Sequence, residues 1–144
     1  MLIPDVNVLV HAHRPDSAEH ELNRGWLERR ASADEPTGIP DLVLSGFIRV
    51  VTHPRVFARP SPLEDALLVT EQLRGMPSFV ALAPGPRHWG IFTRLCADAR
   101  AAGNLVPDAY LGAIALEVGA EIVTGDSDFA KLPGVRWHRP GAST

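Results

Sequence analysis

The sequence predicts an α/β fold with a mainly parallel sheet. Short apolar segments of strand-like composition alternate along the chain with longer segments whose apolar residues recur at helical spacing. This alternation is typical of βαβ units, in which a helix connects two parallel strands. The length of 144 residues is close to the commonest size of one domain, and it suffices to bury a core without disulfides. We therefore expect a single domain over residues 1–144.

The first predicted strand covers residues 2–4 and ends at Asp5. Further apolar residues lead into a turn, after which Ser17 is a candidate cap for a helix over residues 18–31. Residues 34–38 are polar and contain a proline, so we expect a loop there.

Two more helices are predicted in the middle of the chain. Pro40 opens a helical pattern that ends before Pro54, because the residue before a proline disfavours the helical conformation. An ordered loop over residues 53–60 follows. The sequence Ser61-Pro62-Leu63-Glu64 then has the form of a capping box with proline at the first helical position, and Gly75 ends that helix.

Strands and helices alternate most clearly in the remaining part of the chain, where strand-like apolar runs lie between helical patterns bounded by glycine and proline. The predicted elements are a buried strand at 79–82, a helix at about 87–101, a helix from Asn104 or Pro107 to Gly119, a strand at 121–124 and an edge strand at 135–137.

The composition excludes several protein classes. Apolar residues make up 45% and charged residues 22% of the chain, as in ordinary globular proteins. No apolar run approaches the roughly 18 residues of a membrane-spanning helix, and the first residues lack the pattern of a signal peptide. A lone cysteine, Cys96, allows no internal disulfide, which fits a reducing compartment. We expect a cytoplasmic protein with no membrane partner.

The net charge of −3 excludes binding to nucleic acid through bulk positive charge, so any such contact needs a local basic patch. Thirteen of the fourteen basic residues are arginine. Lys131 is therefore the sole candidate for any mechanism that needs a catalytic lysine.

Three acidic residues far apart in sequence are predicted to meet at one edge of the sheet. Asp5 and Asp126 each follow a strand, and Asp108 lies at the start of the helix that leads back to the later strand. Because such a helix runs antiparallel to its strands, its first turn lies at the carboxyl edge of the sheet, where both strands end.

Clustered carboxylates repel one another and bind protons or cations. Oxygen ligands favour a hard ion such as Mg²⁺ or Mn²⁺, which polarises a phosphodiester and lowers the pKa of a bound water. Each residue also has an ordinary explanation: Asp5 and Asp126 as turn residues, and Asp108 as a helix N-terminal acid. Their coincidence at one edge favours a site.

Three blocks of the sequence resemble the acidic blocks of PIN-domain ribonucleases, with the VapC toxins of toxin–antitoxin modules as the closest match. The blocks are Asp5-Val6-Asn7-Val8-Leu9, Pro107-Asp108-Ala109-Tyr110-Leu111 and Thr124-Gly125-Asp126-Ser127-Asp128-Phe129. The resemblance implies a PIN-like three-layer α/β/α fold with a central sheet of four to five short strands. It also implies Mg²⁺- or Mn²⁺-dependent cleavage of RNA, a homodimer and a small VapB-like antitoxin that inhibits the enzyme.

The resemblance assigns roles to individual positions. Asp5 and Asp108 would be the principal catalytic metal ligands, and Asp126 would complete the site directly or through water. Asp128 is a weaker candidate for a ligand. Asn7 and Thr124 match positions that orient the first and last carboxylates by hydrogen bonding.

Two positions depart from the family's pattern. Gly46 stands where the family commonly has a glutamate, and Val6 replaces the usual hydroxyl residue after the first aspartate. The missing glutamate leaves open how the metal set and its general base are completed. Asp41 could substitute only if its helix is oriented favourably, and it is not assigned.

Basic and aromatic residues in or beside loops are candidates for contact with RNA. Arginine can bind phosphate, and an aromatic ring can stack on an unpaired base. Solvated arginines, arginines paired with acids and aromatic core residues are the ordinary alternatives. The candidates for phosphate contact are Arg49, Arg55 and Arg87, and those for stacking are Phe57 and Trp89.

The histidines do not predict a zinc site. His11 and His13 are two residues apart, which on a helix places them on different faces.

Three functions follow from these residues. The leading hypothesis is a metal-dependent endoribonuclease toxin that cleaves structured or translation-related RNA. The alternative is a catalytically weak PIN-like module that binds RNA or protein, as the missing acid at Gly46 would favour. A phosphatase with Asp5 as nucleophile is a third possibility, which would depend on Lys131 to neutralise the phosphoryl group.

Overall fold

Five short parallel strands form one sheet in the order β3-β2-β1-β4-β5. The computed structural model describes residues 1–141. The strands are β1 (Leu2–Pro4), β2 (Thr37–Pro40), β3 (Phe79–Leu82), β4 (Glu121–Val123) and β5 (Trp137–His138). The helices are α1 (Val6–His13), α2 (His20–Ala31), α3 (Asp41–Val51), α4 (Leu63–Arg74), α5 (His88–Ala99) and α6 (Leu105–Val118), with a 3₁₀ helix η1 (Ser127–Lys131).

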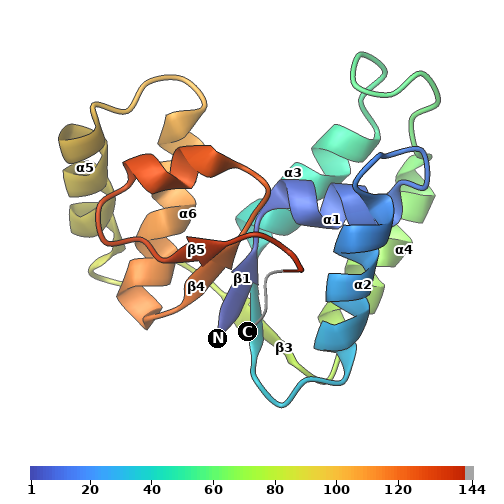
Figure 1. The fold of residues 1–144 in the computed structure, drawn as a ribbon, viewed down its shortest axis with the longest axis horizontal. Coiled ribbons are helices and arrows are strands. Elements are labelled where there is room, and N and C mark those ends of the chain that lie inside the picture. Colours follow the sequence, from blue (N-terminus) through green and yellow to red (C-terminus); the bar gives the residue numbers. More distant parts are fainter. Residues whose placement is uncertain (142–144) are drawn as a thin grey trace.

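Helices cover both faces of the sheet, so the predicted three-layer α/β/α architecture is confirmed. Figure 1 shows α5 and α6 on one side of the strands and α1 to α4 on the other. This division follows from topology: the chain moves outward from β1 to β2 and β3, and then returns to pair β4 with the other side of β1. The strand order thus reverses between β1 and β4, and ligands of open α/β sheets bind at such a point, beside the carboxyl ends of the strands.

The core lies on both faces of the inner strands. Ile3, Ile39 and Ile122, one from each of β1, β2 and β4, have no exposed surface, and Phe47 and Phe129 are equally enclosed. Strands buried on both faces consist of nearly continuous apolar residues, which explains why β1 and β4 were recognisable in the sequence. Among the helices of residues 1–141, none combines the length and apolar composition required to traverse a lipid bilayer.

The predicted loop over residues 34–38 is wrong in its second half, because Thr37–Pro40 is the strand β2. The polar composition and Pro36 predicted the loop, whereas Gly38 is a strand residue whose role is close packing. A Cβ atom there would lie 2.5 Å from the Leu82 side chain and 2.8 Å from the Met1 sulfur. Pro40 ends the strand and precedes the helix α3.

The predicted capping box at residues 61–64 does not form. The α4 helix begins at Leu63 without a side-chain cap, and Ser61 Oγ instead lies 3.1 Å from His13 Nε2 and accepts a hydrogen bond from Arg14 Nη1 at 3.2 Å. Arg14 is 8% exposed, so its guanidinium needs acceptors, and the Ser61 hydroxyl supplies one.

The predicted cap at Ser17 is also wrong. The α2 helix begins at His20 without a side-chain cap, and Ser17 Oγ instead contacts His11 Nδ1 and accepts from Glu19 N.

Two other expectations differ from the structure. The strand predicted as buried at residues 79–82 is the edge strand β3, whose residues are half-buried or exposed. Residues 6–13, which were expected only to lead into a turn, form the helix α1 with four buried apolar residues. Apolar residues on several sides of this short helix obscured its period.

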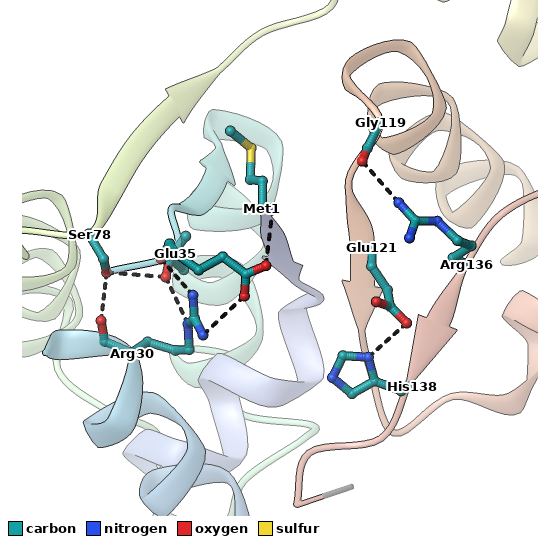
Figure 2. A network of polar contacts seen from close by, with 9 residues as sticks. Met1, Arg30, Glu35, Ser78, Gly119, Glu121, Arg136 and His138 are labelled. Atoms are coloured by element: carbon teal, nitrogen blue, oxygen red, sulfur yellow. Dashed lines mark hydrogen bonds and ion pairs between the residues drawn. The ribbon is translucent and has the colours of Figure 1, made fainter. Parts of the chain in front are cut away.

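Acidic side chains at the amino edge of the sheet each lie beside a nitrogen group (Figure 2). The Met1 ammonium lies 3.4 Å from Glu35, and the Arg30 guanidinium lies 3.5 Å from the same carboxylate. On the other side of this edge, Glu121 lies 3.0 Å from His138 Nδ1. Acidic groups at this edge are therefore partnered by nitrogen groups.

Candidate active site

Asp5 is held rigidly at the carboxyl end of β1. It caps the helix α1, and its Oδ1 accepts a hydrogen bond from the backbone N–H of Val6 at 2.7 Å. Oδ2 accepts from Thr124 Oγ1 at 2.8 Å and from Asn7 Nδ2 at 3.0 Å. Asn7 and Thr124 thus fix the orientation of this 8% exposed carboxylate.

Asp126 and Asp128 lie in the turn that follows β4. Asp126 Oδ1 accepts from the backbone N–H of Asp128 at 2.8 Å and caps the 3₁₀ helix η1. The N–H of Asp126 donates to Thr124 Oγ1 at 3.0 Å, so Thr124 holds the backbone of this residue and the carboxylate of Asp5. The Asp128 carboxylate lies 3.1 Å from Lys131 Nζ.

Asp108 lies in the first turn of α6, which brings its carboxylate to the same edge. One carboxylate oxygen from each of Asp108, Asp126 and Asp128 lies within 4.8 Å of the other two. Asp5 is outside this tight group but lines one cavity together with Asp108 and Asp126. The structure therefore brings all four carboxylates together, with Asp128 in the closest trio and Asp5 at its side.

The clustered charges alter the protonation of two carboxyl groups. Burial, and then the negative charges of Asp5, Asp126 and Asp128, raise the pKa of Asp108 from 3.8 to about 7. Burial also raises the pKa of Asp5, although its hydrogen bonds from Thr124, Val6 and Asn7 oppose this effect. The part of these shifts that comes from repulsion between the carboxylates is the part that a bound cation would relieve.

The donor set fits a hard divalent cation. Every candidate ligand in the trio is a carboxylate oxygen, which Mg²⁺ and Mn²⁺ prefer over nitrogen or sulfur. Asp5 also keeps acceptor capacity, because a carboxylate has about four lone-pair positions and three of them are used here.

The two departures from the family's pattern contact each other. A Cβ atom at Gly46 would lie 2.7 Å from Val6 Cγ2, so the Val6 side chain fills the space into which a residue at position 46 would extend. Asp41 does not supply the missing acid: its 89% exposed carboxylate lies 3.5 Å from Arg74 and is not part of the cavity wall.

Some of the residues predicted to contact RNA lie at the acidic cavity, and others lie away from it. Arg49 lines the acidic cavity, as does Phe57, whose ring lies beneath the Arg14 guanidinium at 4.0 Å. Arg55 is exposed in the adjacent loop. Arg87 lies at the other end of α6, where it donates to the backbone carbonyl of Glu117, so the structure does not bring it to the acids.

The remaining aromatic candidate, Trp89, lies on α5 and packs against Phe92 with ring centroids 5.4 Å apart. It is not among the residues that line the acidic cavity.

Two residues that the sequence did not single out for this edge lie beside the acids. His11 lines the acidic cavity, four residues after Asn7 on α1, and this helical spacing was a usable signal. Arg139 donates to the backbone carbonyl of Gly125, next to Asp126. No sequence pattern distinguishes Arg139 from the other arginines, because its position depends on β5 pairing with β4.

Comparison with known proteins identifies the family of this chain. Residues 2–135 match the PIN domain family. Ribonuclease VapC43 of Mycobacterium tuberculosis is 49% identical over 140 residues, which cover 97% of this chain and 95% of that protein. Ribonuclease VapC25 of the same organism is 44% identical over 97% of this chain and 99% of its own length.

Solved structures share the fold at low sequence identity. The VapBC2 complex of Rickettsia felis, bound to promoter DNA, contains a chain that matches with a TM-score of 0.72 at 15% identity, over 96% of this chain and 97% of that one. VapC20 of M. tuberculosis, a toxin that cleaves the sarcin–ricin loop, matches with a TM-score of 0.64 at 15% identity, over 94% and 99% of the two chains. With the sequence matches, the shared fold shows that this chain belongs to the PIN domain family, in its group of VapC ribonucleases.

Proposed function

We propose that this protein is a cytoplasmic endoribonuclease, dependent on Mg²⁺ or Mn²⁺, that acts as the toxin of a toxin–antitoxin module. The observation that carries the proposal is the meeting of Asp5, Asp108, Asp126 and Asp128 at the point where the strand order reverses. The VapC ribonucleases that it resembles over nearly the full chain support the same activity. Residues 1–144 act as one catalytic domain in this proposal.

Asp5, Asp108 and Asp126 would hold the ion, and Asp128 would contribute from the same cluster. A bound divalent cation would supply neutralising charge to the phosphodiester and would make a water molecule more acidic. The protein's own contribution is a set of carboxylates in fixed positions. The bonds from Asn7 and Thr124 to Asp5 maintain this geometry before substrate arrives, so little reorganisation is needed during reaction.

The proposed substrate is structured or translation-related RNA. VapC20, which has the same fold, is a toxin that cleaves the sarcin–ricin loop. In this proposal Arg49, which lines the cavity, would bind a phosphate of the RNA backbone, and so would Arg55 in the adjacent loop.

The proposed partners are a small VapB-like antitoxin, which would block the site, and a second copy of this chain. Support for the antitoxin comes from the VapBC complexes of Rickettsia felis and Salmonella typhimurium, whose toxin-like chains share this fold.

A cleavage assay tests the proposed activity. The purified protein should cleave RNA with Mg²⁺ or Mn²⁺ and lose this activity in EDTA. Asp108→Asn should lower the rate about 10²–10³-fold, the usual effect of removing one strong electrostatic contact in an active site. Asp41→Asn is the matched control, because it makes the same chemical change at an exposed carboxylate outside the cavity. Equal cleavage by Asp108→Asn and the parent would refute the assignment.

One observation favours a second candidate function, a catalytically weak module that binds RNA or protein. Gly46 supplies no carboxylate where the family commonly has a glutamate, and the Val6 side chain fills the adjacent space. Calorimetric titration separates the two functions. Retained RNA binding without uptake of Mg²⁺ or Mn²⁺ at millimolar concentration would support the binding module, and ion uptake would support the nuclease.

A further inference from the structure

A second cavity lies beside the acidic one and shares part of its wall. The acidic cavity has a volume of about 520 Å³ and the second one about 480 Å³. Asn7, His11 and Asp126 line both cavities. The two cavities therefore form one groove across the carboxyl edge of the sheet, with Asp126 at their junction.

The second cavity combines three kinds of chemistry. Arg139 supplies positive charge, Leu22 and Pro140 supply apolar surface, and Asn23 supplies an amide. Its volume lies within the range of small-molecule pockets, which is roughly 300–1,000 Å³. A guanidinium binds phosphate oxygens through two parallel hydrogen bonds, while apolar surface and an amide suit the face and the edge of a base. Two acids lie in this wall: Asp126, which belongs to the acidic cluster at the junction, and Glu19, which is exposed.

The Arg139 side chain is oriented but keeps most of its binding capacity. Nη1 donates to the carbonyl of Gly125, and Cζ lies 5.8 Å from the centroid of the Trp137 ring. A guanidinium has five N–H donors, so the single described bond leaves four for a ligand. The ion pairs within residues 1–141 do not include Arg139.

Arg49 lines the acidic cavity, and it too has no ion-pair partner within the described part of the chain. Each of the two adjoining cavities thus has a guanidinium in its wall. A polyanion that crosses a cluster of carboxylates gains from such cations along its path.

We propose that the second cavity is a nucleotide subsite of the RNA groove, in which Arg139 binds the backbone phosphate next to the one that is cleaved. This inference rests on the proposed nuclease function and adds the path of the substrate. Leu22 and Pro140 contact the base of that nucleotide, and Asn23 accepts or donates a hydrogen bond at its edge. The RNA must be unpaired at this position, since a base inside a duplex does not reach the apolar wall.

The experiment compares two arginines of the same segment. Arg136 and Arg139 are both exposed, and each donates to one glycine carbonyl. Arg136 binds Gly119 (Figure 2) and is not among the residues that line the groove. Arg139→Gln and Arg136→Gln are each made in the Asp108→Asn protein, in which cleavage should be about 10²–10³-fold slower and so limited during the binding measurement. Fluorescence anisotropy then measures the Kd for a short fluorescein-labelled single-stranded RNA over a series of salt concentrations.

We expect Arg139→Gln to raise the Kd about 5- to 10-fold, the loss of one charge-assisted contact. The slope of log affinity against log salt should fall by about 0.7, the value for one phosphate of a single strand. Arg136→Gln should change neither quantity. RNAs that each carry one uncharged methylphosphonate linkage, at a different position in each RNA, locate the contact. At the linkage that Arg139 binds, the loss of charge should raise the Kd of the protein that keeps Arg139 but should not raise the Kd of Arg139→Gln any further.

Two outcomes would overturn the inference in distinguishable ways. If the parent cleaves RNA but Arg139→Gln matches Arg136→Gln in Kd and salt slope, Arg139 serves only to hold the Gly125 loop, and the groove receives another partner such as an acidic protein segment. If the parent neither cleaves nor binds RNA, the proposed function itself fails, and the subsite fails with it.

Discussion

Acidic side chains meet cations at the amino edge of the sheet and meet one another at its carboxyl edge. At the amino edge, Glu35 lies between the Met1 ammonium and the Arg30 guanidinium. At the carboxyl edge, the carboxylates of Asp108 and Asp126 lie close together, and the one ion pair described in that cluster joins Asp128 to Lys131. The two edges belong to the same five strands, so the contrast comes from side chains and not from backbone architecture.

The contrast shows that charged side chains stabilise the fold at the amino edge of the sheet and not at the carboxyl edge. Carboxylates without cations repel one another, and their desolvation costs free energy of folding. A chain that pairs its charges at one edge has the means to do so at the other. Asp5, Asp108 and Asp126 have no ion-pair partner within residues 1–141, which indicates a site completed by a ligand. Removing an acid at the carboxyl edge and removing one at the amino edge should therefore change the stability in opposite directions.

The largest expected effect is stabilisation of the carboxyl edge by a divalent ion. An ion that binds the folded state alone stabilises it by about 2.7 kcal/mol at a concentration one hundred times its Kd. The melting temperature of the parent should rise accordingly with Mn²⁺ in differential scanning calorimetry. Asp108→Asn should show a much smaller rise, and Glu35→Gln should keep the full one. An equal rise in Asp108→Asn would show that the ion binds elsewhere.

A second effect concerns pH in the absence of metal. The pKa of Asp108 is about 7 in the folded protein and 3.8 as its ordinary value, so the folded state binds this proton more tightly. The stability that Asp108 contributes is therefore complete below about pH 4 and is lost as the pH rises toward 7 and beyond. Asp108→Asn removes this loss, because an amide does not ionise.

A shift of this size corresponds to about 4 kcal/mol for an isolated group, and partial solvation reduces the expected effect to about 1–2 kcal/mol. Urea unfolding in EDTA should find Asp108→Asn more stable than the parent at pH 8, with a smaller difference at pH 4. A less stable variant at pH 8 would mean that the Asp108 carboxylate has a stabilising partner, which contradicts the cluster described here.

The convergence of the acids could be predicted because it depends on topology alone. Asp5 and Asp126 follow strands and Asp108 starts a helix, and parallel βαβ connections bring such positions to one edge. The pattern could not rank the ligands. Whether Asp5 or Asp128 lies closer to Asp108 depends on the turn after β4 and on the hydrogen bonds of Thr124, which have no signature in residue spacing.

The errors share a physical cause, which is tertiary contact overriding local preference. Gly38 is found in a strand because neighbouring side chains leave no room for a Cβ atom. Ser61 gives its hydroxyl to a buried arginine and not to a helix end. Val6 and Gly46 each departed from the family's pattern, and only the structure shows that the two positions are in contact.

The smallest expected effect is at the amino edge, and it has the opposite sign. Glu35→Gln should destabilise the protein by about 0.2–1 kcal/mol, because a half-exposed carboxylate gains little from ion pairs and Arg30 keeps its bonds to Thr37 Oγ1 and to the backbone carbonyl of residue 35. RNA cleavage should be unchanged. Urea unfolding of Glu35→Gln and Asp108→Asn in parallel at pH 8 shows whether the two substitutions change the free energy of unfolding in opposite directions. If Glu35→Gln stabilises the protein as Asp108→Asn does, ion pairing is not what distinguishes the two edges, and the unpaired acids would lose their value as a sign of function.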